Sequence, residues 1–402
     1  MKKILLIMPY GSVGGMERLA LTFYNHYRSL GYEVKALKII KLDSDIIHFG
    51  DDELFLSGVD FSGMTMQRRM RFYFSVPLYI RRIIKKYSIT HSIAFGDMAN
   101  VFSSWTRTKE FKVASMHAVK SIEFENKNFL NKVFKRAFRK SYRNFDKVVC
   151  ISNAIRKDLL ANCGYAFDNL EVIYNPHDVA EIRRKSAEDL PAADVALFEK
   201  EVVLFLGRMS VQKAPWHLVN AFGLLQKRRP DAQLVLIGDG SPEVTRHLER
   251  QIAQHQISNI HFLGRRSNPY QYMARAKVVA LSSYYEGTPN VVVEAMALGI
   301  PVVSAFTPGI TELMRVVDVE ETKALTRTEA GIVTPPFFKG RLNIPDTSVV
   351  TEEEKIYADA LQETLGTDAY TKTLAEHQAA LLAKFDLRQV AAAYLEPITR
   401  NK

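Results

Sequence analysis

The chain has 402 residues, which indicates two or three domains; 47% of them are hydrophobic and 24% are charged. This composition excludes a disordered chain, a collagen-like chain and a small disulfide-bonded protein, because it provides enough apolar material for a large core. The net charge of +10 is uneven: residues 1–178 hold 28 Lys/Arg and 17 Asp/Glu, whereas residues 179–402 hold 26 and 27. One basic half and one neutral half indicate two domains with different partners.

The start of the chain resembles a signal peptide, with two lysines and an apolar run from Ile4 to Met8. That run is shorter than the apolar region of a signal peptide and ends at Pro9, so it predicts a buried strand instead. No 18 apolar residues run together, which predicts that no helix spans a membrane. The two cysteines, Cys150 and Cys163, are too few for a disulfide framework. We expect a cytoplasmic protein, soluble or peripheral on the inner face of the cell membrane.

Strand-like and helical patterns alternate along the first half of the chain. Strands are predicted at Lys3–Met8, Glu33–Lys38, Ser92–Phe95, Lys112–Met116 and Lys147–Ile151. Helices are predicted at Met16–Leu30, Arg82–Tyr87 and Phe129–Tyr142.

The second half of the chain restarts the same scheme. Strands are predicted at Val202–Leu206, Gln233–Ile237, Ile260–Phe262, Val278–Leu281 and Val302–Ser304. Helices are predicted at His217–Lys227, Glu243–Gln254 and Asn290–Leu298.

Short Val/Ile/Leu runs that alternate with helices predict an α/β fold: two doubly wound, Rossmann-like parallel-sheet domains that face each other across a cleft. The predicted domains are 1–178 and 179–385, with a helical tail at 386–402 that packs back on the first domain. The stretch 316–351 has no clear periodicity and predicts a long surface excursion.

A glycine-rich turn, Gly11-Ser-Val-Gly14-Gly15-Met-Glu17-Arg18, follows the first strand and opens a helix. Adjacent glycines at such a turn let the backbone approach a phosphate, whose charge is attracted by the helix N-terminus. The pattern is neither a dinucleotide fingerprint nor a Walker loop, and an ordinary tight turn explains it equally well.

Two cations follow the first strand of the second half, in Gly207-Arg208 and Gln212-Lys213. Their spacing places both at the end of a parallel sheet where anionic ligands bind, although an exposed pair of this kind is more often solvated surface. Glycine turns also follow the next two strands, at Gly238-Asp239-Gly240 and at Gly264-Arg265. The first of these lacks the third glycine of a dinucleotide fingerprint, which disfavours a nicotinamide-dependent enzyme.

The most informative stretch runs from Ser282 to Pro301 and holds two glutamates eight positions apart, Glu286 and Glu294. A Gly-Thr-Pro-Asn turn between them predicts a helix start, so Glu286 lies in a loop and Glu294 one turn into the helix. Buried carboxylates need partners, and ligand hydroxyls would satisfy them. A capping residue and an internal salt bridge are the structural alternative.

The pattern E-G-x-P-N-x-x-x-E-A-M-A-x-G-x-P resembles the E-x7-E segment of the retaining family 4 glycosyltransferases, which have the GT-B fold. The resemblance extends along most of the chain in matching order and spacing. It includes the GGMER turn, ISN at 151–153, VIYNP at 172–176, GRMSVQK, IGDG, FLGR and PGITE at 308–312.

The resemblance implies a role for each matching position. His117 resembles the active-site histidine, although a lone histidine at a strand end is more often structural. Glu286 would hold donor-sugar hydroxyls near the reacting carbon, while Arg208 and Lys213 would hold the leaving diphosphate. The other implied donor-binding residues are the phosphate-facing Gly14 and Gly15, the base-contacting Gly264 and Arg265, Gly287, the phosphate-cradling Thr288, Asn290 and Val291, and the ribose-holding Glu294.

Two features depart from the common family pattern: Pro215-Trp216 stands where a glycine and a small residue are usual, and the excursion after Glu312 is long. No metal and no cofactor are expected besides a nucleotide-sugar substrate such as a UDP- or GDP-hexose. The D-x-D motif Asp43-Ser44-Asp45 lies too early in the chain for a metal site and predicts a solvated turn.

The resemblance implies retaining transfer of a hexosyl group. We expect a glycan acceptor that is lipid-linked, in bacterial-type surface polysaccharide or glycolipid biosynthesis (lipopolysaccharide or capsule). A sugar-nucleotide epimerase or a phosphorylase-like enzyme of the same architecture is the alternative. Nucleic-acid binding is disfavoured, because the basic residues lie on amphipathic helices without an aromatic-glycine RNA motif.

The basic half also predicts docking on an anionic membrane surface. In Leu78–Tyr87, Ile80, Ile83, Ile84 and Tyr87 form one face beside four cations. Phe129–Arg143 has the same character, and such helices can lie in a lipid interface. Packing of both apolar faces on the sheet is the alternative. The residues assigned there to the apolar face are Leu130, Val133, Phe134, Ala137 and Phe138.

Overall fold

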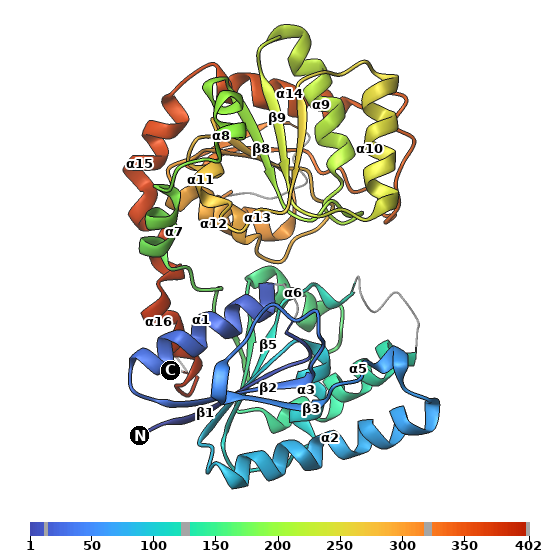
Figure 1. Cartoon of the computed structure of the whole chain (residues 1–402), viewed down its shortest axis with the longest axis vertical. Coiled ribbons are helices and arrows are strands. Elements are labelled where there is room, and N and C mark those ends of the chain that lie inside the picture. The colour runs from blue at the N-terminus through green and yellow to red at the C-terminus, as the bar shows by residue number, and fades with distance from the viewer. Residues whose placement is uncertain (12–14, 122–128, 317–323, 399–402) are drawn as a thin grey trace. The chain divides into compact units, whose positions relative to one another are not determined.

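The computed structural model describes residues 1–11, 15–121, 129–316 and 324–398. The chain divides into two compact units, unit 1 (Met1–Pro176 and Leu387–Lys402) and unit 2 (His177–Asp386) (Figure 1). The unit boundaries fall at 176/177 and 386/387, where the sequence predicted 178/179 and 385/386. Within these described ranges no helix has the length and apolar character needed to cross a membrane.

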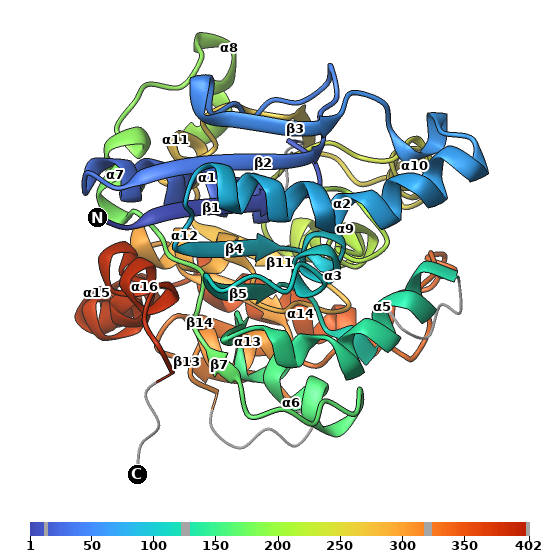
Figure 2. The ribbon, with the colours of Figure 1, turned by 90° about the horizontal axis from the view of Figure 1, so that it is seen from below.

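Unit 1 is built on a seven-stranded parallel sheet in the order β3-β2-β1-β4-β5-β6-β7. Figure 2 shows the first five of these strands side by side. Central strand β1 is buried on both faces, which explains its unbroken apolar run. The strands are β1 (Lys3–Met8), β2 (Glu33–Ile40), β3 (Glu53–Ser57), β4 (His91–Phe95), β5 (Phe111–Met116), β6 (Lys147–Cys150) and β7 (Leu170–Val172).

Helices cover both faces of this sheet. Because side chains alternate along a strand, Ile4 and Leu6 of β1 pack with α1 and α16, while Leu5 and Ile7 pack with α2 and α3. The helices of unit 1 are α1 (Gly15–Ser29), α2 (Met66–Lys86), α3 (Asp97–Ser104), α5 (Phe129–Lys140), α6 (Asn153–Ala161) and, from the far end of the chain, α16 (Leu387–Tyr394).

Helix α16 is anchored in the core of unit 1 by apolar and polar contacts. The Tyr394 side chain is fully buried, its ring lies 4.7 Å from that of Phe23, and its hydroxyl is 2.8 Å from the Ser115 hydroxyl. The Tyr27 hydroxyl donates to the Ala391 carbonyl at 2.8 Å. The described part of the predicted tail therefore includes a helix that belongs to the first unit.

Unit 2 has its own seven-stranded sheet, in the order β10-β9-β8-β11-β12-β14-β13, in which only the β13–β14 pair is antiparallel among the described strands. The strands are β8 (Val202–Leu206), β9 (Gln233–Ile237), β10 (Ile260–Gly264), β11 (Val278–Leu281), β12 (Val302–Ala305), β13 (Thr326–Thr328) and β14 (Gly331–Thr334). The helices are α7 (Val179–Ser186), α8 (Ala192–Val195), α9 (Pro215–Arg228), α10 (Pro242–Gln254), α11 (Tyr270–Met273), α12 (Asn290–Ala297), α13 (Pro308–Leu313), α14 (Glu352–Leu365) and α15 (Ala369–Leu382).

The predicted fold of two doubly wound parallel sheets is confirmed, and every strand predicted from an apolar run exists. The prediction for 316–351 was wrong in part, because this stretch contains β13 and β14, and β14 pairs with β12 inside the sheet. Both strands are too short to produce a recognisable periodic pattern in the sequence.

The prediction of a solvated turn at Asp43-Ser44-Asp45 was also wrong for its last residue. The Asp45 carboxylate is buried, lies 3.2 Å from the ammonium of fully buried Lys38 and accepts a hydrogen bond from the Gly11 amide at 3.0 Å. Glu53 also pairs with Lys38, at 3.0 Å. A buried ammonium needs such partners, and Asp45 also bonds the first residue of the glycine turn, Gly11.

Candidate functional site

The main candidate site of unit 2 lies in the loops that follow β8 and β11. Lys213 ends the first loop, and Glu286 lies in the second. Their side chains form an ion pair of 2.5 Å between Nζ and Oε1. Glu286 is buried (6% exposed), and the hydroxyl of Ser283 donates to its Oε1 at 2.6 Å. The structure therefore brings together two of the four predicted catalytic residues.

Backbone and side-chain bonds hold the two loops together. The Tyr284 amide donates to the Gln212 carbonyl at 2.8 Å, and the Gln212 side-chain amide donates to the Tyr285 carbonyl at 3.1 Å. The Ser282 hydroxyl donates to the Lys213 carbonyl at 3.0 Å. These bonds fix the spacing between the cation and the carboxylate, which the sequence pattern alone does not give.

Two glycines allow the backbone to approach these loops closely. A Cβ atom at Gly238 would lie 2.0 Å from the carbonyl oxygen of Gly207, the residue before Arg208. A Cβ atom at Gly309, in α13, would lie 2.2 Å from the carbonyl oxygen of Gly287 and 2.7 Å from that of Glu286. The loops therefore lie against glycine backbone, and side chains at these two positions would displace them.

Helix α12 carries the second glutamate. Asn290 is its first residue, preceded by Pro289, as the sequence predicted. Glu294 is half-buried in this helix and accepts a hydrogen bond from the Tyr270 hydroxyl at 3.2 Å. The helix begins directly after the Glu286 loop, so its positive end lies beside that loop. Thr288 and Val291 are buried there.

Arg208 and Arg265 are exposed. Within the described part of the chain, the Arg208 guanidinium makes no hydrogen bond or ion pair, so it is available to an anionic ligand. Gly264 has a left-handed backbone (φ +63°), and its carbonyl accepts a hydrogen bond from the Gly238 amide at 3.0 Å. The predicted base-contacting turn is therefore bonded to the turn that supports Arg208.

Unit 1 holds the remaining predicted residues. His117 follows β5 and is half-buried, and no hydrogen-bond partner of its Nε2 is found among the described residues. Burial, assisted by the Lys120 ammonium, lowers the pKa of His117 to about 3, so the imidazole is neutral at neutral pH. Gly15 is the first residue of α1, whereas the prediction for Gly14 falls outside the described residues.

Sequence reasoning missed Ser283, Tyr270 and Gly309 as parts of this site. Ser283 lies only three residues before Glu286, and a hydroxyl so near a buried carboxylate is a signal that could have found it. Gly309 stands in the family-like PGITE motif, but its role depends on a close approach between two distant segments. Tyr270 carries no local signal.

Models of two glycosyltransferase families match the chain. Glycosyltransferase Family 4 matches residues 13–181, and Glycosyl transferases group 1 matches residues 200–332. A glycosyltransferase of unassigned activity from Methanocaldococcus jannaschii is 25% identical over 46% of this chain and 45% of its own length. The N-acetylgalactosamine-N,N'-diacetylbacillosaminyl-diphospho-undecaprenol 4-alpha-N-acetylgalactosaminyltransferase of Campylobacter jejuni is 27% identical over 51% of this chain and 53% of its own length. The alignments thus span about half of each of these two relatives.

A solved structure resembles the whole chain. Anabaena HepE, in complex with UDP and glucose, matches with a TM-score of 0.72 at 20% identity, over 98% of both chains. This likeness identifies the fold. Taken together, the two matched families, the paired sheets and the loops that hold Lys213 and Glu286 show that the chain belongs to the group 1, family 4 glycosyltransferases with the GT-B fold.

Proposed function

We propose that this protein transfers a hexosyl group from a nucleotide sugar, such as a UDP- or GDP-hexose, to an acceptor hydroxyl. The observation that carries the proposal is the buried Glu286 carboxylate paired with Lys213 at the carboxyl end of the second sheet. In this arrangement a carboxylate that can accept sugar hydroxyls lies beside a cation that can bind a phosphate. Retention of the anomeric configuration is the outcome that the family resemblance implies.

The chemistry requires stabilisation of negative charge. Breaking the bond between the anomeric carbon and the diphosphate leaves charge on the diphosphate, and Lys213, Arg208 and the amides at the start of α12 would neutralise it. Glu294 would hold the ribose. The family resemblance implies that His117 of unit 1 is the active-site histidine, and its neutral imidazole can donate or accept a hydrogen bond. We propose no metal for this reaction.

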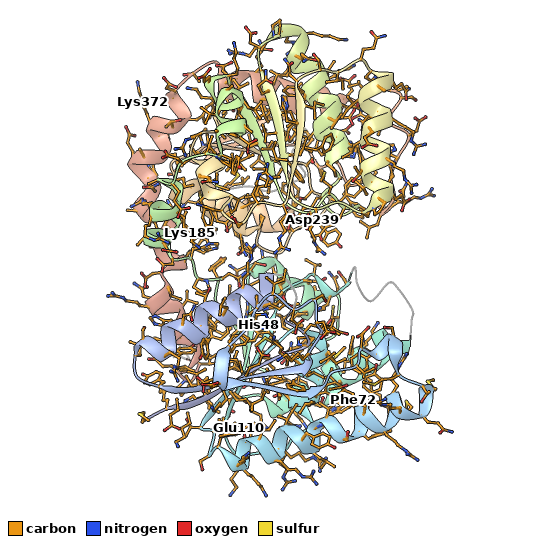
Figure 3. The ribbon with its side chains drawn as sticks, in the orientation of Figure 1. His48, Phe72, Glu110, Lys185, Asp239 and Lys372 are labelled. Atoms are coloured by element: carbon orange, nitrogen blue, oxygen red, sulfur yellow. The ribbon has the colours of Figure 1, made fainter. Side chains whose placement is uncertain are left out.

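Removing either cation tests the assignment. Arg208→Ala and Lys213→Ala should each lower kcat about a hundredfold, as expected for the loss of one group that stabilises the leaving charge. The measurement is release of nucleoside diphosphate from a panel of nucleotide sugars, with and without acceptor. Lys372→Ala, on the exposed side of α15, is the matched control (Figure 3). Near-normal kcat in both site variants, with folding intact, would overturn the assignment, and isomerisation of the donor without acceptor would favour an epimerase.

A lipid-linked acceptor is the finer part of the proposal. The Campylobacter relative acts, by its name, on a diphospho-undecaprenol substrate, and the basic excess of this chain lies in unit 1. An enzyme with such an acceptor works at a membrane surface, and the inner leaflet is anionic. We therefore place the protein peripherally on this surface, with a role in surface polysaccharide or glycolipid synthesis.

The described residues predicted to contact the membrane from the apolar faces of α2 and α5 are not available to it. Ile80 and Ile84 of α2 are buried in the core of unit 1, and Ile83 packs against that core. In α5, Ala137 and Phe138 are buried as well. The predicted apolar faces therefore pack on the sheet wherever their side chains are described; those of Leu130 and Val133 fall outside the described side chains.

The outward side of α2 offers a different set of residues. Phe74 is 72% exposed, Leu78 56% and Tyr79 41%. The helix has no acidic residue and seven cations: Arg68, Arg69, Arg71, Arg81, Arg82, Lys85 and Lys86. An exposed apolar stripe among cations complements an anionic lipid surface, where each cation contributes about 1 kcal/mol. We propose that this outward side of α2 is the docking surface.

Vesicle sedimentation tests the surface. The protein should bind vesicles rich in phosphatidylglycerol, and binding should fade as salt rises, because the attraction is screened. Arg81→Gln with Arg82→Gln should weaken binding by about thirtyfold, corresponding to about 2 kcal/mol. Arg246→Gln with Arg250→Gln, on exposed sites of α10, removes equal charge from unit 2 and should leave binding unchanged. Equal binding to neutral vesicles, or equal loss in both double variants, would contradict the proposal.

A further inference from the structure

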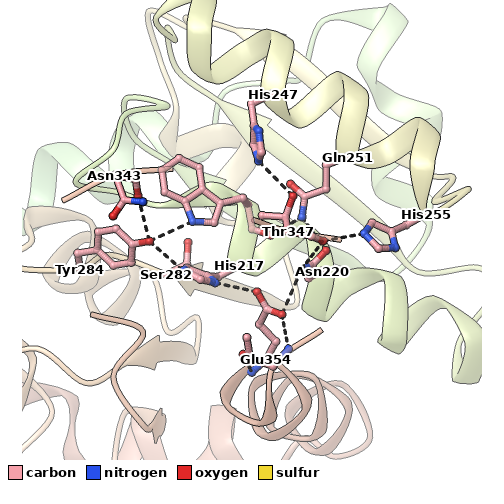
Figure 4. A network of polar contacts seen from close by, with 12 residues as sticks. His217, Asn220, His247, Gln251, His255, Ser282, Tyr284, Asn343, Thr347 and Glu354 are labelled. Carbon is pink, nitrogen blue, oxygen red and sulfur yellow. Dashed lines mark hydrogen bonds and ion pairs between the residues drawn. The ribbon is translucent and has the colours of Figure 1, made fainter. Parts of the chain in front are cut away.

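Residues 337–347, here called the strap, form the middle of the segment between β14 and α14 and lie against a buried polar network in unit 2 (Figure 4). The Phe337 ring stacks on the His217 ring, with centroids 4.3 Å apart and planes 11° apart. The Phe338 ring lies 5.7 Å from that of Tyr284. The Thr347 carbonyl accepts a hydrogen bond from Nε2 of His255 at 2.8 Å. The strap is therefore fixed to side chains of three other segments.

Tyr284 is the residue at which the strap meets the candidate site. Its side chain is buried, and its hydroxyl donates to the strap carbonyl of Asn343 at 3.4 Å. Its own backbone amide donates to Gln212, the neighbour of Lys213. Two residues further along the chain lies Glu286. One residue thus connects the strap to both loops of the site, through its side chain and its backbone amide.

The hydrogens around this hydroxyl can be assigned from the chemistry of its partners. The Trp216 indole N–H, 3.3 Å away, can only donate, and the Asn343 carbonyl can only accept. The single hydroxyl hydrogen of Tyr284 is therefore committed to Asn343, and Nε2 of His217, at 3.2 Å, must donate to Tyr284. The hydroxyl is fully used, with two donors and one acceptor.

The second ring nitrogen of His217, Nδ1, is also bonded. Its Nδ1 lies 2.7 Å from Oε1 of buried Glu354, the residue that closes the capping box of α14. The other oxygen of Glu354 accepts from the Thr351 amide at 2.8 Å and from the Asn220 side chain at 3.1 Å. Because both ring nitrogens are bonded, the imidazole cannot turn, and it presents one N–H to Tyr284.

We propose that the strap, acting through His217 and Tyr284, positions the Glu286 loop for the donor sugar. This inference rests on the proposed function and deepens it: His217 and Tyr284 are positioning residues, since in the described part of the chain neither side chain forms a hydrogen bond or ion pair with Glu286 or Lys213. The Glu286 loop has no regular secondary structure, and bonds to neighbouring segments help to fix it, besides its internal bond from Ser283 to Glu286. A carboxylate misplaced by about 1 Å can lower the rate about a hundredfold, so a buried anchor two residues away matters for catalysis.

Tyr284→Phe is the main test, because it keeps the ring and removes one oxygen, leaving the two donors without an acceptor. Hydrogen exchange of the amides of residues 282–287 should accelerate by about tenfold. With the nucleotide sugar that the wild-type enzyme uses, kcat should fall by at least about tenfold, while the affinity for UDP or GDP alone changes by less than about twofold. Phe338→Leu, on the strap, should shift both readouts in the same direction by a smaller factor.

Tyr370→Phe is the matched control, because it removes a hydroxyl that bonds Glu363 on a different part of unit 2. It should lower thermal stability about as much as Tyr284→Phe does. The hydrogen exchange of residues 282–287 and kcat should both stay unchanged. Unchanged exchange in Tyr284→Phe would overturn the link between strap and loop, and faster exchange with normal kcat would overturn its role in positioning. If the wild-type protein uses no nucleotide sugar, the proposed function fails, while the exchange experiment still decides whether the strap orders the loop.

Discussion

At the scale of single residues, Gly309 shows how little room the Glu286 loop has. The first turn of α13 lies against the carbonyls of Glu286 and Gly287, so the space that a methyl group would need is already filled by backbone. Backbone atoms cannot move aside as a flexible side chain can. The loop itself would have to shift, and the Glu286 carboxylate would shift with it.

Gly309→Ala should therefore reduce activity more than its chemical size suggests. We expect kcat to fall by about tenfold or more and the free energy of unfolding to fall by about 1–3 kcal/mol, as for overpacking in a dense region. Gly58→Ala is the control, because its methyl group would meet open space. Steady-state kinetics and denaturant unfolding measure the two effects. Normal kcat in Gly309→Ala would mean that the loop tolerates the shift.

The sequence predicted Lys213 and Glu286 as site residues through the family resemblance, because an exposed cation at the end of a sheet is by itself more often solvated surface. It did not predict that they pair directly, since their spacing depends on the bonds from Gln212 and Ser282 between two loops. Asp45 shows the converse. The residues next to Asp45 in the sequence predict a turn. Asp45 is nevertheless buried, because it pairs with the buried Lys38 of β2.

At the scale of elements, the apolar strands could be predicted from the sequence, whereas helices without a continuous apolar stripe could not. A strand such as Val202–Leu206 is covered on both faces, so its composition identifies it. Helix α2 was predicted only from Arg82, although it begins at Met66. Phe74 is exposed and Pro77 lies near the middle of the helix, so no clean apolar stripe marks its first half.

Ala214 illustrates a local exception within an element. It is the N-cap of α9 with a left-handed backbone (φ +43°), a conformation usually given to glycine, and it is fully buried. The cost of this conformation is offset by packing of its methyl group in the core of unit 2. The departure from the family pattern at Pro215-Trp216 directly follows Ala214 in the chain, and it places the buried Trp216 in the first turn of α9.

At the scale of the whole molecule, the chain returns to unit 1 after completing unit 2. The sequence predicted a helical tail that packs back, and α16 lies in unit 1. Its buried contacts could not be assigned beforehand, because a short amphipathic helix fits many surfaces. The contacts of Tyr394 show that α16 belongs to unit 1, because its ring and its hydroxyl both have partners in the core of that unit.

Two buried thiols offer a direct test of this anchoring. Burial raises the pKa of Cys150 and of Cys163 to about 12, so at pH 8 neither forms appreciable thiolate in the folded unit 1. Tyr394→Ala should destabilise unit 1 by about 3–5 kcal/mol and accelerate thiol labelling at least about a hundredfold. Leu374→Ala, an equally buried site in unit 2, should leave labelling unchanged. Slow labelling in Tyr394→Ala would show that unit 1 holds together without the tail.

The position of α16 also has a consequence for synthesis on the ribosome. Unit 2 is one uninterrupted segment of chain, whereas unit 1 lacks Tyr394 and Val390 until the ribosome has passed through all of unit 2. Unit 1, which is synthesised first, therefore stays incomplete until α16 has been made. During this time the ring of Phe23 lacks its contact with Tyr394. The nascent half would be a client for chaperones during this interval, and the later half would be the first to mature.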